Sequence, residues 1–409
     1  MQTFSRSNQT ELIKKNIIFV CGLLPNHLTK EIEINSIGAI QSAADTQQKA
    51  LAEGLFHFDK KLILINLMYI GSYPKRYRSA VIEYSKYMNE NGIVIRNVGF
   101  LNVSVVKFVS RYLNARKELL KVVNNESVIL IYAAHLPFIA AAISAKRRVS
   151  GLKICLAIPD VPEFMADKGF VRDFLIGIQT NLFKFLYKRM DGFLFVTKFI
   201  ADYIEVGSKP YLVVDGLYQE GFLQVPETKD ENFTILYSGT LAERYDIMNL
   251  IQAFAIIKDE RFRLWIFGDG DCNLRISTAA KADSRITFFG QRPREQVLAY
   301  QKRASVLVNP RTGCQSYTKY SFPSKLLEYC ASGTPVILRR LQGVDEEYYK
   351  HCFVVEGDSA VALAECLSSV SKLSSLELQS KGKLARSFVL ENKHYLIQSQ
   401  RVLGFLLGL

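Results

Sequence analysis

The chain has 409 residues, of which 49% are hydrophobic and 22% charged. This near-average composition excludes collagen-like, low-complexity and wholly disordered proteins. At about 100 to 200 residues per domain, the length predicts two or three domains. The 52 basic residues exceed the 39 acidic ones and give a net charge of +13, spread over both halves of the chain. We therefore expect nucleotide phosphates or an anionic membrane surface as partners, and no nucleic acid.

The cysteines and the N-terminus indicate the compartment. Seven cysteines are scattered and never spaced C-x-x-C, which predicts free thiols and no zinc site. The polar first 15 residues lack the apolar core of a signal peptide, so we expect a cytoplasmic protein.

Three segments bear on membrane contact. Residues Val128–Ala145 are uncharged and near the lower length limit of a spanning helix. A β-branched start and the interruption Ala133–Pro137 instead predict a strand, a loop and a helix. Val103–Val123 and Val171–Met190 mix apolar and basic residues at helical spacing. They are typical of helices packed on a sheet or of a peripheral contact with the inner face of a membrane.

Apolar strand-like runs alternate with amphipathic segments along nearly the whole chain, the pattern of parallel βαβ units. The first series of predicted strands covers residues 16–21, 62–67, 93–98, 128–132, 153–158 and 192–196. The second series covers residues 233–237, 262–267, 286–289, 305–308, 335–338 and 353–355. We therefore predict an α/β fold of two doubly wound, Rossmann-like domains that face each other across a cleft.

A charged, proline-containing stretch at residues 220–232 separates the two series and predicts a linker, with a hinge near residues 216–232. The predicted domains are residues 1–228 and 229–387. The last apolar-periodic segment, residues 388–409, is predicted to be a helix that crosses back to the first domain.

The stretch Asn309–Ile337 carries the strongest functional signal. It predicts a strand, a polar loop and a helix that starts around residues 322–323 and is closed by Gly333. A helix N-terminus attracts anions, and Lys325 on the first turn adds a positive charge. Glu328 lies three residues further along the same face, where a carboxylate can accept hydrogen bonds from two ribose hydroxyls. The alternative is a simple surface ion pair between Lys325 and Glu328.

This helix resembles the donor-binding helix of the retaining glycosyltransferases of family 4, which have the GT-B fold. In that family the second glutamate of an E-x7-E motif binds the ribose of a sugar nucleotide, and Glu328 matches it. Tyr320 stands where the first glutamate would be, and Ser324 lies at the helix start. The run Thr318–Lys325 also resembles a branch of polysaccharide-assembly enzymes, so we do not interpret Tyr320 as a sign of inactivity.

The loop after the first strand of the second series resembles the family's diphosphate-binding loop, where Gly-Arg-Leu is followed by a lysine. Gly239 keeps the glycine, Thr240 replaces the arginine and Tyr245 aligns with the lysine. Arg244 and Arg311 are then the candidate cations, because a guanidinium binds phosphate bidentately. Ordinary surface arginines are the alternative.

Two further strand ends resemble borders of the family's donor site. Gly268 follows one strand, and Gly290 and Arg292 follow the next, where the nucleotide base rests on backbone. Asp269 and Asp271 imitate the metal-binding D-x-D of another glycosyltransferase fold. One such motif is common by chance, so we predict no metal.

The first domain offers three loops. Gly22 follows the first strand, where family members often show two glycines that contact the donor. His135 follows the fourth strand and would orient the donor sugar or an acceptor hydroxyl, although a lone histidine is often structural. Asp160 and Glu163 follow the fifth strand and would bind acceptor hydroxyls.

The resemblance implies a retaining glycosyltransferase that binds its acceptor in the first domain and its nucleotide sugar in the second. The acceptor would be a saccharide, lipid-linked, in the synthesis of capsule, exopolysaccharide or O-antigen, and no cofactor is expected. Arg244, Arg311 and Lys325 would stabilise the departing diphosphate. Two alternatives stay open: a nucleotide-sugar epimerase, and a non-catalytic GT-B partner of another transferase.

Overall fold

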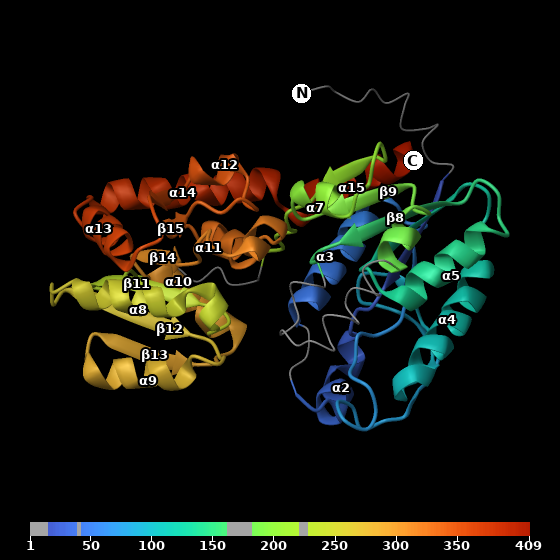
Figure 1. Ribbon diagram of the computed structural model, residues 1–409, viewed down its shortest axis with the longest axis horizontal. Coiled ribbons are helices and arrows are strands. Elements are labelled where there is room, and N and C mark those ends of the chain that lie inside the picture. The colour runs from blue at the N-terminus through green and yellow to red at the C-terminus, as the bar shows by residue number, and fades with distance from the viewer. Residues whose placement is uncertain (1–14, 39–41, 162–181, 221–227) are drawn as a thin grey trace. The chain divides into compact units, whose positions relative to one another are not determined.

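The computed structural model describes residues 15–38, 42–161, 182–220 and 228–409. These residues form two compact units (Figure 1). Unit 1 contains the described residues up to Leu217 together with Tyr395–Leu409, and unit 2 spans Tyr218–His394. The chain therefore returns to unit 1 with its last helix.

Unit 1 is built on an eight-stranded sheet in the order β10-β9-β8-β7-β1-β2-β5-β4. Neighbouring strands are parallel except β4 and β5, which are antiparallel. The strands of this sheet are β1 (Asn16–Cys21), β2 (Ile63–Asn66), β4 (Ser85–Met88), β5 (Val94–Asn97), β7 (Ser127–Tyr132), β8 (Lys153–Ile158), β9 (Gly192–Phe195) and β10 (Tyr211–Val213). A separate antiparallel pair joins β3 (Val81–Ile82) and β6 (Phe100–Leu101). The order of connection reverses between β1 and β7, where ligands bind in such sheets.

The helices of unit 1 are α2 (Thr29–Asn35), α3 (Ser42–Phe58), α4 (Ser104–Leu120), α5 (Leu136–Lys146), α7 (Phe199–Tyr203) and α15 (Tyr395–Gly408), with a 3-10 turn, η2, at Asn26–Leu28. Helix α15 packs on α3 so closely that a Cβ atom at Gly54 would lie 2.1 Å from the Oγ atom of Ser399. Phe19, Leu55 and Leu406 from β1, α3 and α15 share one buried core. The last helix is therefore part of the core of unit 1.

Unit 2 is built on a fully parallel six-stranded sheet in the order β13-β12-β11-β14-β15-β16. Counted from β11, this is the order 3-2-1-4-5-6 of dinucleotide-binding folds, with the reversal between β11 and β14. The strands are β11 (Phe233–Ser238), β12 (Phe262–Phe267), β13 (Ile286–Gly290), β14 (Val306–Asn309), β15 (Val336–Arg339) and β16 (Phe353–Val355).

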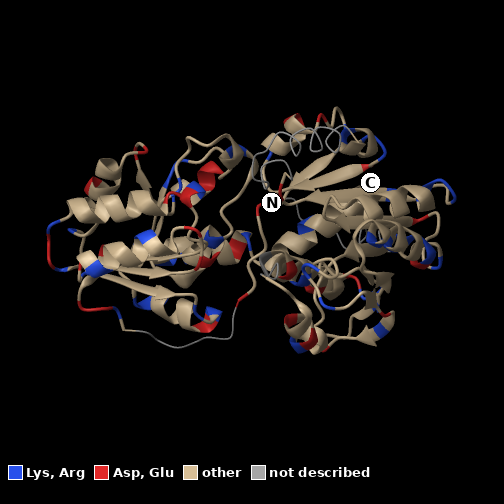
Figure 2. Cartoon of the chain, turned by 60° about the horizontal axis from the view of Figure 1, so that its bottom comes forward, with Lys and Arg blue, Asp and Glu red and all other residues tan. Residues whose placement is uncertain are grey.

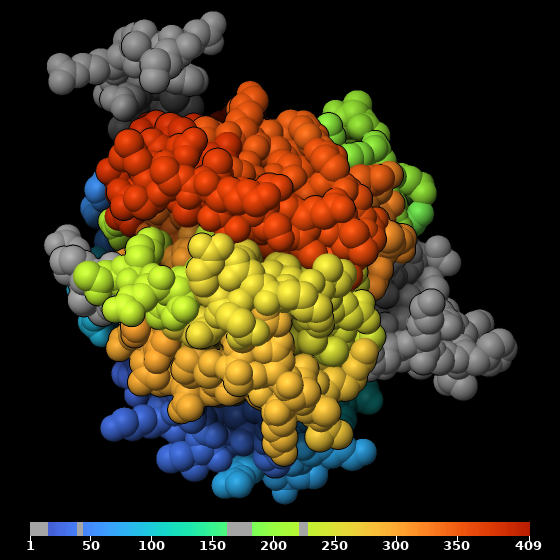
Figure 3. Space-filling view, turned by 90° about the vertical axis from the view of Figure 1, so that its left-hand side faces the viewer, coloured from blue at the N-terminus to red at the C-terminus, as the bar shows by residue number. Residues whose placement is uncertain are grey.

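The helices of unit 2 are α8 (Ile247–Ile256), α9 (Asn273–Ala282), α10 (Arg294–Arg303), α11 (Lys325–Ser332), α12 (Glu346–Tyr349), α13 (Ala360–Val370) and α14 (Ser375–Asn392), with 3-10 turns η4 (Glu243–Tyr245) and η5 (Ser316–Tyr320). Side chains alternate along the strands, so the sheet carries two cores. On β11, Ile235 packs with α8, α9 and α13, whereas Leu236 packs with α10, α11 and α14. Helices α13 and α8 adjoin on the surface shown in Figure 3, where α13 is orange-red and α8 is yellow.

The two-sheet α/β fold predicted from the apolar runs is confirmed, and each predicted strand matches an observed strand within one residue at either end. Residues 128–145 form a strand, a loop and a helix, also as predicted. The strands β3, β4, β6 and β10 were not predicted, because they have only two to four residues and β4 begins with two polar residues and has no buried side chain. In the described ranges, no helix is long and apolar enough to cross a membrane.

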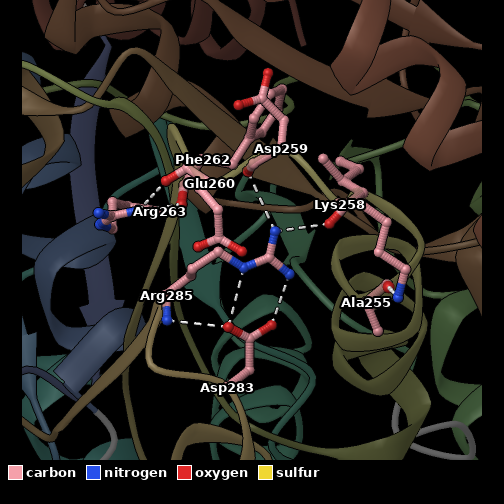
Figure 4. A network of polar contacts seen from close by, with 9 residues as sticks. Ala255, Lys258, Asp259, Glu260, Phe262, Arg263, Asp283 and Arg285 are labelled. Atoms are coloured by element: carbon pink, nitrogen blue, oxygen red, sulfur yellow. Dashed lines mark hydrogen bonds and ion pairs between the residues drawn. The ribbon is translucent and has the colours of Figure 1, made fainter.

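Basic and acidic residues are interspersed over both units (Figure 2). One network of them staples the amino ends of β12 and β13 (Figure 4). Arg285 donates to the Asp283 carboxylate over 2.7 and 3.0 Å and to the carbonyl oxygens of Ile257 and Asp259 over 2.7 and 3.2 Å. The hydrogen bond from Arg285 lowers the pKa of Asp283. This network ties together the amino ends of two strands, whereas ligands of parallel sheets bind at the carboxyl ends.

Candidate functional site

The candidate donor site of unit 2 lies where the carboxyl ends of β11 and β14 diverge. Ser238 ends β11 and is followed by Gly239 and Thr240, and Asn309 ends β14 and is followed shortly by Arg311. The backbone N–H of Gly239 donates to the carbonyl oxygen of the last residue of β12 over 3.1 Å, which holds the loop beside the neighbouring strand. Thr240 is exposed at the tip of this loop.

Two predicted glycines have backbone conformations that favour glycine. Gly268 has φ +139°, and a Cβ atom there would lie 1.8 Å from the carbonyl oxygen of Gly239. Gly290 has φ +66° with no heavy atom within 4 Å of a Cβ position. The N–H of Gly268 donates to the carbonyl of Gly290 over 3.0 Å, so the three glycines bring three strand ends together. Arg292 is exposed just beyond them.

Helix α11 begins at Lys325, two to three residues later than predicted. The first backbone bond, from Leu326 N to the carbonyl of Pro323, spans three residues, so the segment before Lys325 is a turn. Ser324 at the N-cap makes no side-chain capping bond, so the first N–H groups of the helix other than that of Leu326 are left for another acceptor. Gly333 ends the helix with φ +78°, as predicted.

Glu328 is the best-held polar side chain of the site. Its Oε1 atom accepts hydrogen bonds from Lys325 Nζ and from Gln301 Nε2, both over 2.8 Å, and its Oε2 atom accepts one from Arg294 Nε over 3.3 Å. Only 12% of the side chain is exposed. The ion pair considered as an alternative therefore exists, but Glu328 itself is nearly buried and also accepts from the fully buried Gln301.

The charge of Glu328 follows from these contacts. Burial by itself raises the pKa of this carboxyl group, but Lys325, Gln301 and Arg294 together outweigh burial and lower it. Glu328 is therefore an anion near neutral pH. Its Oε2 atom carries only the longer bond to Arg294, a side chain that is 54% exposed. This oxygen therefore keeps acceptor capacity for a further donor.

Two further side chains fix Glu328 to the end of β11. The hydroxyl group of Tyr329 accepts from the N–H of Ser238 over 2.7 Å and donates to the carbonyl oxygen of Ser238 over 2.9 Å. The fully buried Gln301 donates to the Oγ atom of Ser238 over 3.0 Å as well as to Glu328. The carboxylate therefore has a fixed position relative to the loop that begins at Gly239.

The structure brings the two candidate arginines together around one ring. The guanidinium groups of Arg244 and Arg311 lie 5.0 and 4.5 Å from the ring centroid of Tyr245. Tyr317 donates to the carbonyl oxygen of Arg244 over 2.6 Å and lies 5.7 Å from the guanidinium of Arg311. Tyr245, at the position of the family's lysine, thus supports two cations. Tyr320, which stands in place of the first motif glutamate, is the last residue of η5, the same 3-10 turn that contains Tyr317.

The D-x-D-like carboxylates have local partners. Asp269 accepts hydrogen bonds from the N–H of Gly270 over 3.0 Å and from the Asn273 side chain. Asp271 accepts from the N–H of Glu243 over 3.2 Å. Within the residues that the structure describes, no group of three or more His, Cys, Asp and Glu side chains could hold a metal ion.

Unit 1 has a pocket of about 540 Å³ at the carboxyl ends of β2, β7 and β8. His135 and Asp160 line it, as does Tyr69. Gly22 is buried next to this pocket: its N–H donates to Gln48 over 2.7 Å, and a Cβ atom would lie 2.4 Å from the ring of Tyr69. A glycine is thus required here by close packing, and its contact with the donor stays a prediction. Glu163 lies outside the described residues.

His135 precedes α5 as its N-cap residue. Burial, with the neighbouring charges of Arg111 and Lys107, lowers the pKa of His135 to about 3, so the imidazole stays neutral near neutral pH. Its Nε2 atom lies 3.5 Å from Arg111 Nη1, and its buried Nδ1 atom has no hydrogen-bond partner among the described residues. A neutral ring suits the predicted role of orienting a hydroxyl.

Sequence reasoning missed several residues that define these sites. Gln301, Tyr329 and Arg294 hold Glu328 in unit 2, and Lys107 and Arg111 face His135 in unit 1. Tyr329 adjoins Glu328 in the sequence, which was the one available signal. The others come from helices that read as ordinary amphipathic segments.

Comparison with known proteins identifies the architecture. Residues 232–372 match the family model described as Glycosyl transferases group 1, whereas no curated protein sequence matches the chain. Similar solved structures include HepE of Anabaena in complex with UDP (11% identity, 96% of this chain and 100% of that chain covered, TM-score 0.65). Sucrose-phosphate synthase of Thermosynechococcus elongatus (14%, 96% and 99%, 0.64) and the apo lipopolysaccharide outer core galactosyltransferase WaaB (13%, 96% and 99%, 0.61) are also similar. The chain therefore has the GT-B fold, and its residues 232–372 are similar to the group 1 glycosyl transferases.

Proposed function

We propose that the chain transfers a hexosyl group, with retention at the anomeric carbon, from a nucleotide sugar to a lipid-linked saccharide during cell-surface polysaccharide synthesis at the inner membrane face. The family match over residues 232–372 supports the reaction class. Structures of HepE with UDP and glucose and with UDP-glucose support a nucleotide hexose as donor. The name of WaaB, an outer core galactosyltransferase, supports a saccharide acceptor.

The arrangement of Glu328 carries this proposal. A nearly buried carboxylate, kept anionic by Lys325, Gln301 and Arg294, sits one turn inside a helix whose first N–H groups have no side-chain cap. The carboxylate suits two vicinal hydroxyls of a pentose, and the helix start suits the attached diphosphate. Both lie at the reversal point of the sheet, where nucleotides bind in such folds.

In the proposed mechanism, negative charge that develops on the leaving diphosphate is stabilised by Arg244, Arg311, Lys325 and the helix start. Glu328 positions the donor and does not attack it. Gly239, Thr240 and Ser324 border the diphosphate, while Gly268, Gly290, Arg292 and Tyr320 border the rest of the donor. In unit 1, neutral His135 orients a sugar hydroxyl and Asp160 binds the acceptor.

We further propose that transfer needs no metal ion. Asp269 has backbone and side-chain partners in its own loop, and Asp271 accepts from the N–H of Glu243 in the loop after β11, which suits a structural role for both. Transfer should continue at an unchanged rate in EDTA. Loss of transfer in EDTA, restored by Mg²⁺ or Mn²⁺, would contradict this part.

A thermal-shift screen with UDP, GDP, dTDP and CMP tests the function. One of them should raise the melting temperature with increasing concentration, because a ligand of the native state stabilises it by mass action. Glu328→Ala should abolish the rise, whereas Glu365→Ala, an exposed carboxylate on α13, should keep it. Flat curves for all nucleotides would overturn the proposal.

The matching nucleotide sugar then distinguishes the enzyme classes. Incubation with membranes that supply acceptor should yield free nucleotide and an elongated lipid-linked product. Epimerised nucleotide sugar formed without acceptor would favour the epimerase. Intact polymer assembly in cells that carry Glu328→Ala and Arg311→Ala, but not in cells without the protein, would favour the non-catalytic partner.

A further inference from the structure

Helix α4 of unit 1 presents its first turns in an unexpected orientation. Val105, Phe108 and Val109 are 77%, 50% and 55% exposed, whereas Lys107 and Arg111 are only 7% and 2% exposed. The buried positions recur every four residues, so the two cations occupy the helix face that packs against the unit. An amphipathic helix normally buries the apolar side chains and exposes the cations.

Among the described residues, the two buried cations have no anionic partner. Lys107 Nζ donates to the carbonyl oxygen of Ile70 over 2.7 Å and contacts the Oγ atom of Ser72 at 3.4 Å. Arg111 donates to the carbonyl oxygens of Leu67, over 3.1 Å, and Met68, and its buried Nε atom has no partner. Across the part of the chain that the structure describes, no carboxylate forms an ion pair with either side chain.

Burying unpaired cations is unfavourable, and this cost lowers the pKa of both side chains. Burial and the charge of Arg111 lower the pKa of Lys107 to about 7, and burial lowers the pKa of Arg111 to about 10. Backbone carbonyls are dipoles and only partly replace a counter-charge. A ligand that carries negative charge would relieve both side chains.

Space for such a ligand adjoins them. Lys107 and Arg111 line the pocket of about 540 Å³ together with Ser72, Arg76 and His135, and Asp160 at the end of β8 is the carboxylate among its lining residues. Phe108, on the same turn of α4, lines the pocket and is half exposed. The pocket therefore combines buried positive charge with an apolar rim.

We propose that Lys107 and Arg111 bind a phosphate group of the acceptor in this pocket. The inference rests on the proposed function, and it adds that the acceptor is anionic as well as glycosidic. The phosphate oxygens replace the missing counter-charge, Ser72 supplies a hydroxyl donor, and neutral His135 is left for an acceptor hydroxyl. The phosphate belongs to a soluble sugar phosphate or to a lipid phosphate whose chain crosses the exposed Val105 and Phe108.

Calorimetric titration with sodium sulfate measures the site, because the charge of sulfate is constant near neutral pH. The nucleoside diphosphate found in the thermal screen is present at saturation to occupy unit 2. Wild-type protein should bind sulfate, Lys107→Met should bind it about tenfold more weakly or not at all, and Lys117→Met, an exposed lysine of α4, should bind it like the wild type. Equal binding by the wild type and Lys107→Met would overturn the proposal.

The pH dependence gives a second, independent readout. The titratable and charged groups that face Lys107 are Arg111 on its own helix and four residues that line the same pocket: Tyr69, Arg76, His135 and Asp160. Sulfate binds the protonated ammonium, so its affinity should fall several-fold as the pH rises from about 7 to about 9. Lys107→Met should show no such fall. A pH-independent affinity in the wild type would contradict the proposed ligand role of Lys107.

Two ligands distinguish the sources of the phosphate. A hexose 1-phosphate in solution and polyprenyl phosphate in phosphatidylcholine vesicles are each compared with neutral counterparts lacking the phosphate. Whichever phosphate binds more tightly than its neutral form, and loses that advantage in Lys107→Met, identifies the source. Absence of any phosphate advantage would overturn the proposal. Arg111→Lys keeps the positive charge and should retain binding, so it is the control for a folding defect in the other variants. The nucleotide-dependent rise in melting temperature tests the proposed function separately.

Discussion

The two units place opposite charges at the same point of similar sheets. In unit 2, the anion Glu328 receives three hydrogen bonds from Lys325, Gln301 and Arg294 before any ligand arrives. In unit 1, Lys107 and Arg111 are buried against carbonyl oxygens, and no carboxylate of the described residues forms an ion pair with them. A carboxylate whose charge is already satisfied can accept neutral hydroxyls, whereas unsatisfied cations require an anion. The architecture sets where ligands bind, and the local charge sets what they must carry.

Removing the satisfied anion should have the largest effect. Glu328→Ala deletes the two hydrogen bonds that the pentose hydroxyls would donate to the charged carboxylate. It also leaves Lys325 and Gln301 without their acceptor. We expect nucleotide affinity to fall by at least about 100-fold, since each such bond contributes about 1.5 to 3 kcal/mol. Calorimetric titration measures this effect, with Glu365→Ala as the control. A loss of less than about threefold would break the comparison, because the carboxylate would then be structural.

Removing the link between Glu328 and β11 should cost stability rather than affinity. Tyr329→Phe leaves the buried N–H and carbonyl of Ser238 without the hydroxyl partner, at a cost of about 1 to 3 kcal/mol. Trp265, the only tryptophan of the chain, is buried in unit 2 and reports its unfolding in urea by fluorescence. Tyr211→Phe, exposed in unit 1, should leave that transition unchanged. Equal stability of both variants would show that the link is dispensable.

Acid should weaken unit 1 through His135. Its folded pKa of about 3 lies below the unfolded value of about 6.5, so the unfolded chain binds the extra proton in this window. Stability is therefore lost as the pH falls from about 6.5 towards 3, by up to about 1.4 kcal/mol per pH unit.

Urea unfolding followed by circular dichroism checks this slope. His135→Gln, which cannot titrate, should flatten it, and His57→Gln, exposed on α3, should not. If the free energy of unfolding changed with pH equally in the wild type and His135→Gln, the cations around the His135 imidazole would not oppose its protonation.

Arg311 should give the smallest effect. Arg311→Ala removes one partly exposed cation beside Tyr245 while Arg244 remains. We expect nucleoside diphosphate affinity to fall by about three- to tenfold, with nucleoside monophosphate affinity nearly unchanged. Parallel titrations with both nucleotides check the difference. An equal loss for both would remove Arg311 from the diphosphate contacts.

The fold could be predicted because apolar runs such as Phe262–Phe267 are buried on both faces of parallel sheets. The place of Glu328 could also be predicted, since the helix start and stop signals and a family resemblance point to it. Its partner Gln301 could not, because that contact joins residues 27 positions apart in different helices. Helix α4 was misleading for a physical reason: Val105 and Phe108 resemble a buried face, yet Lys107 and Arg111 are the residues turned inward.

The most direct test of the account asks whether Glu328 grips the pentose. The selected ribonucleoside diphosphate and its 2′-deoxy and 3′-deoxy forms are titrated into the wild type and Glu328→Ala. We predict that each missing hydroxyl weakens binding to the wild type by about tenfold and to the variant by less than about twofold. An equal loss in both proteins would mean that the hydroxyls are bound elsewhere and would contradict the account.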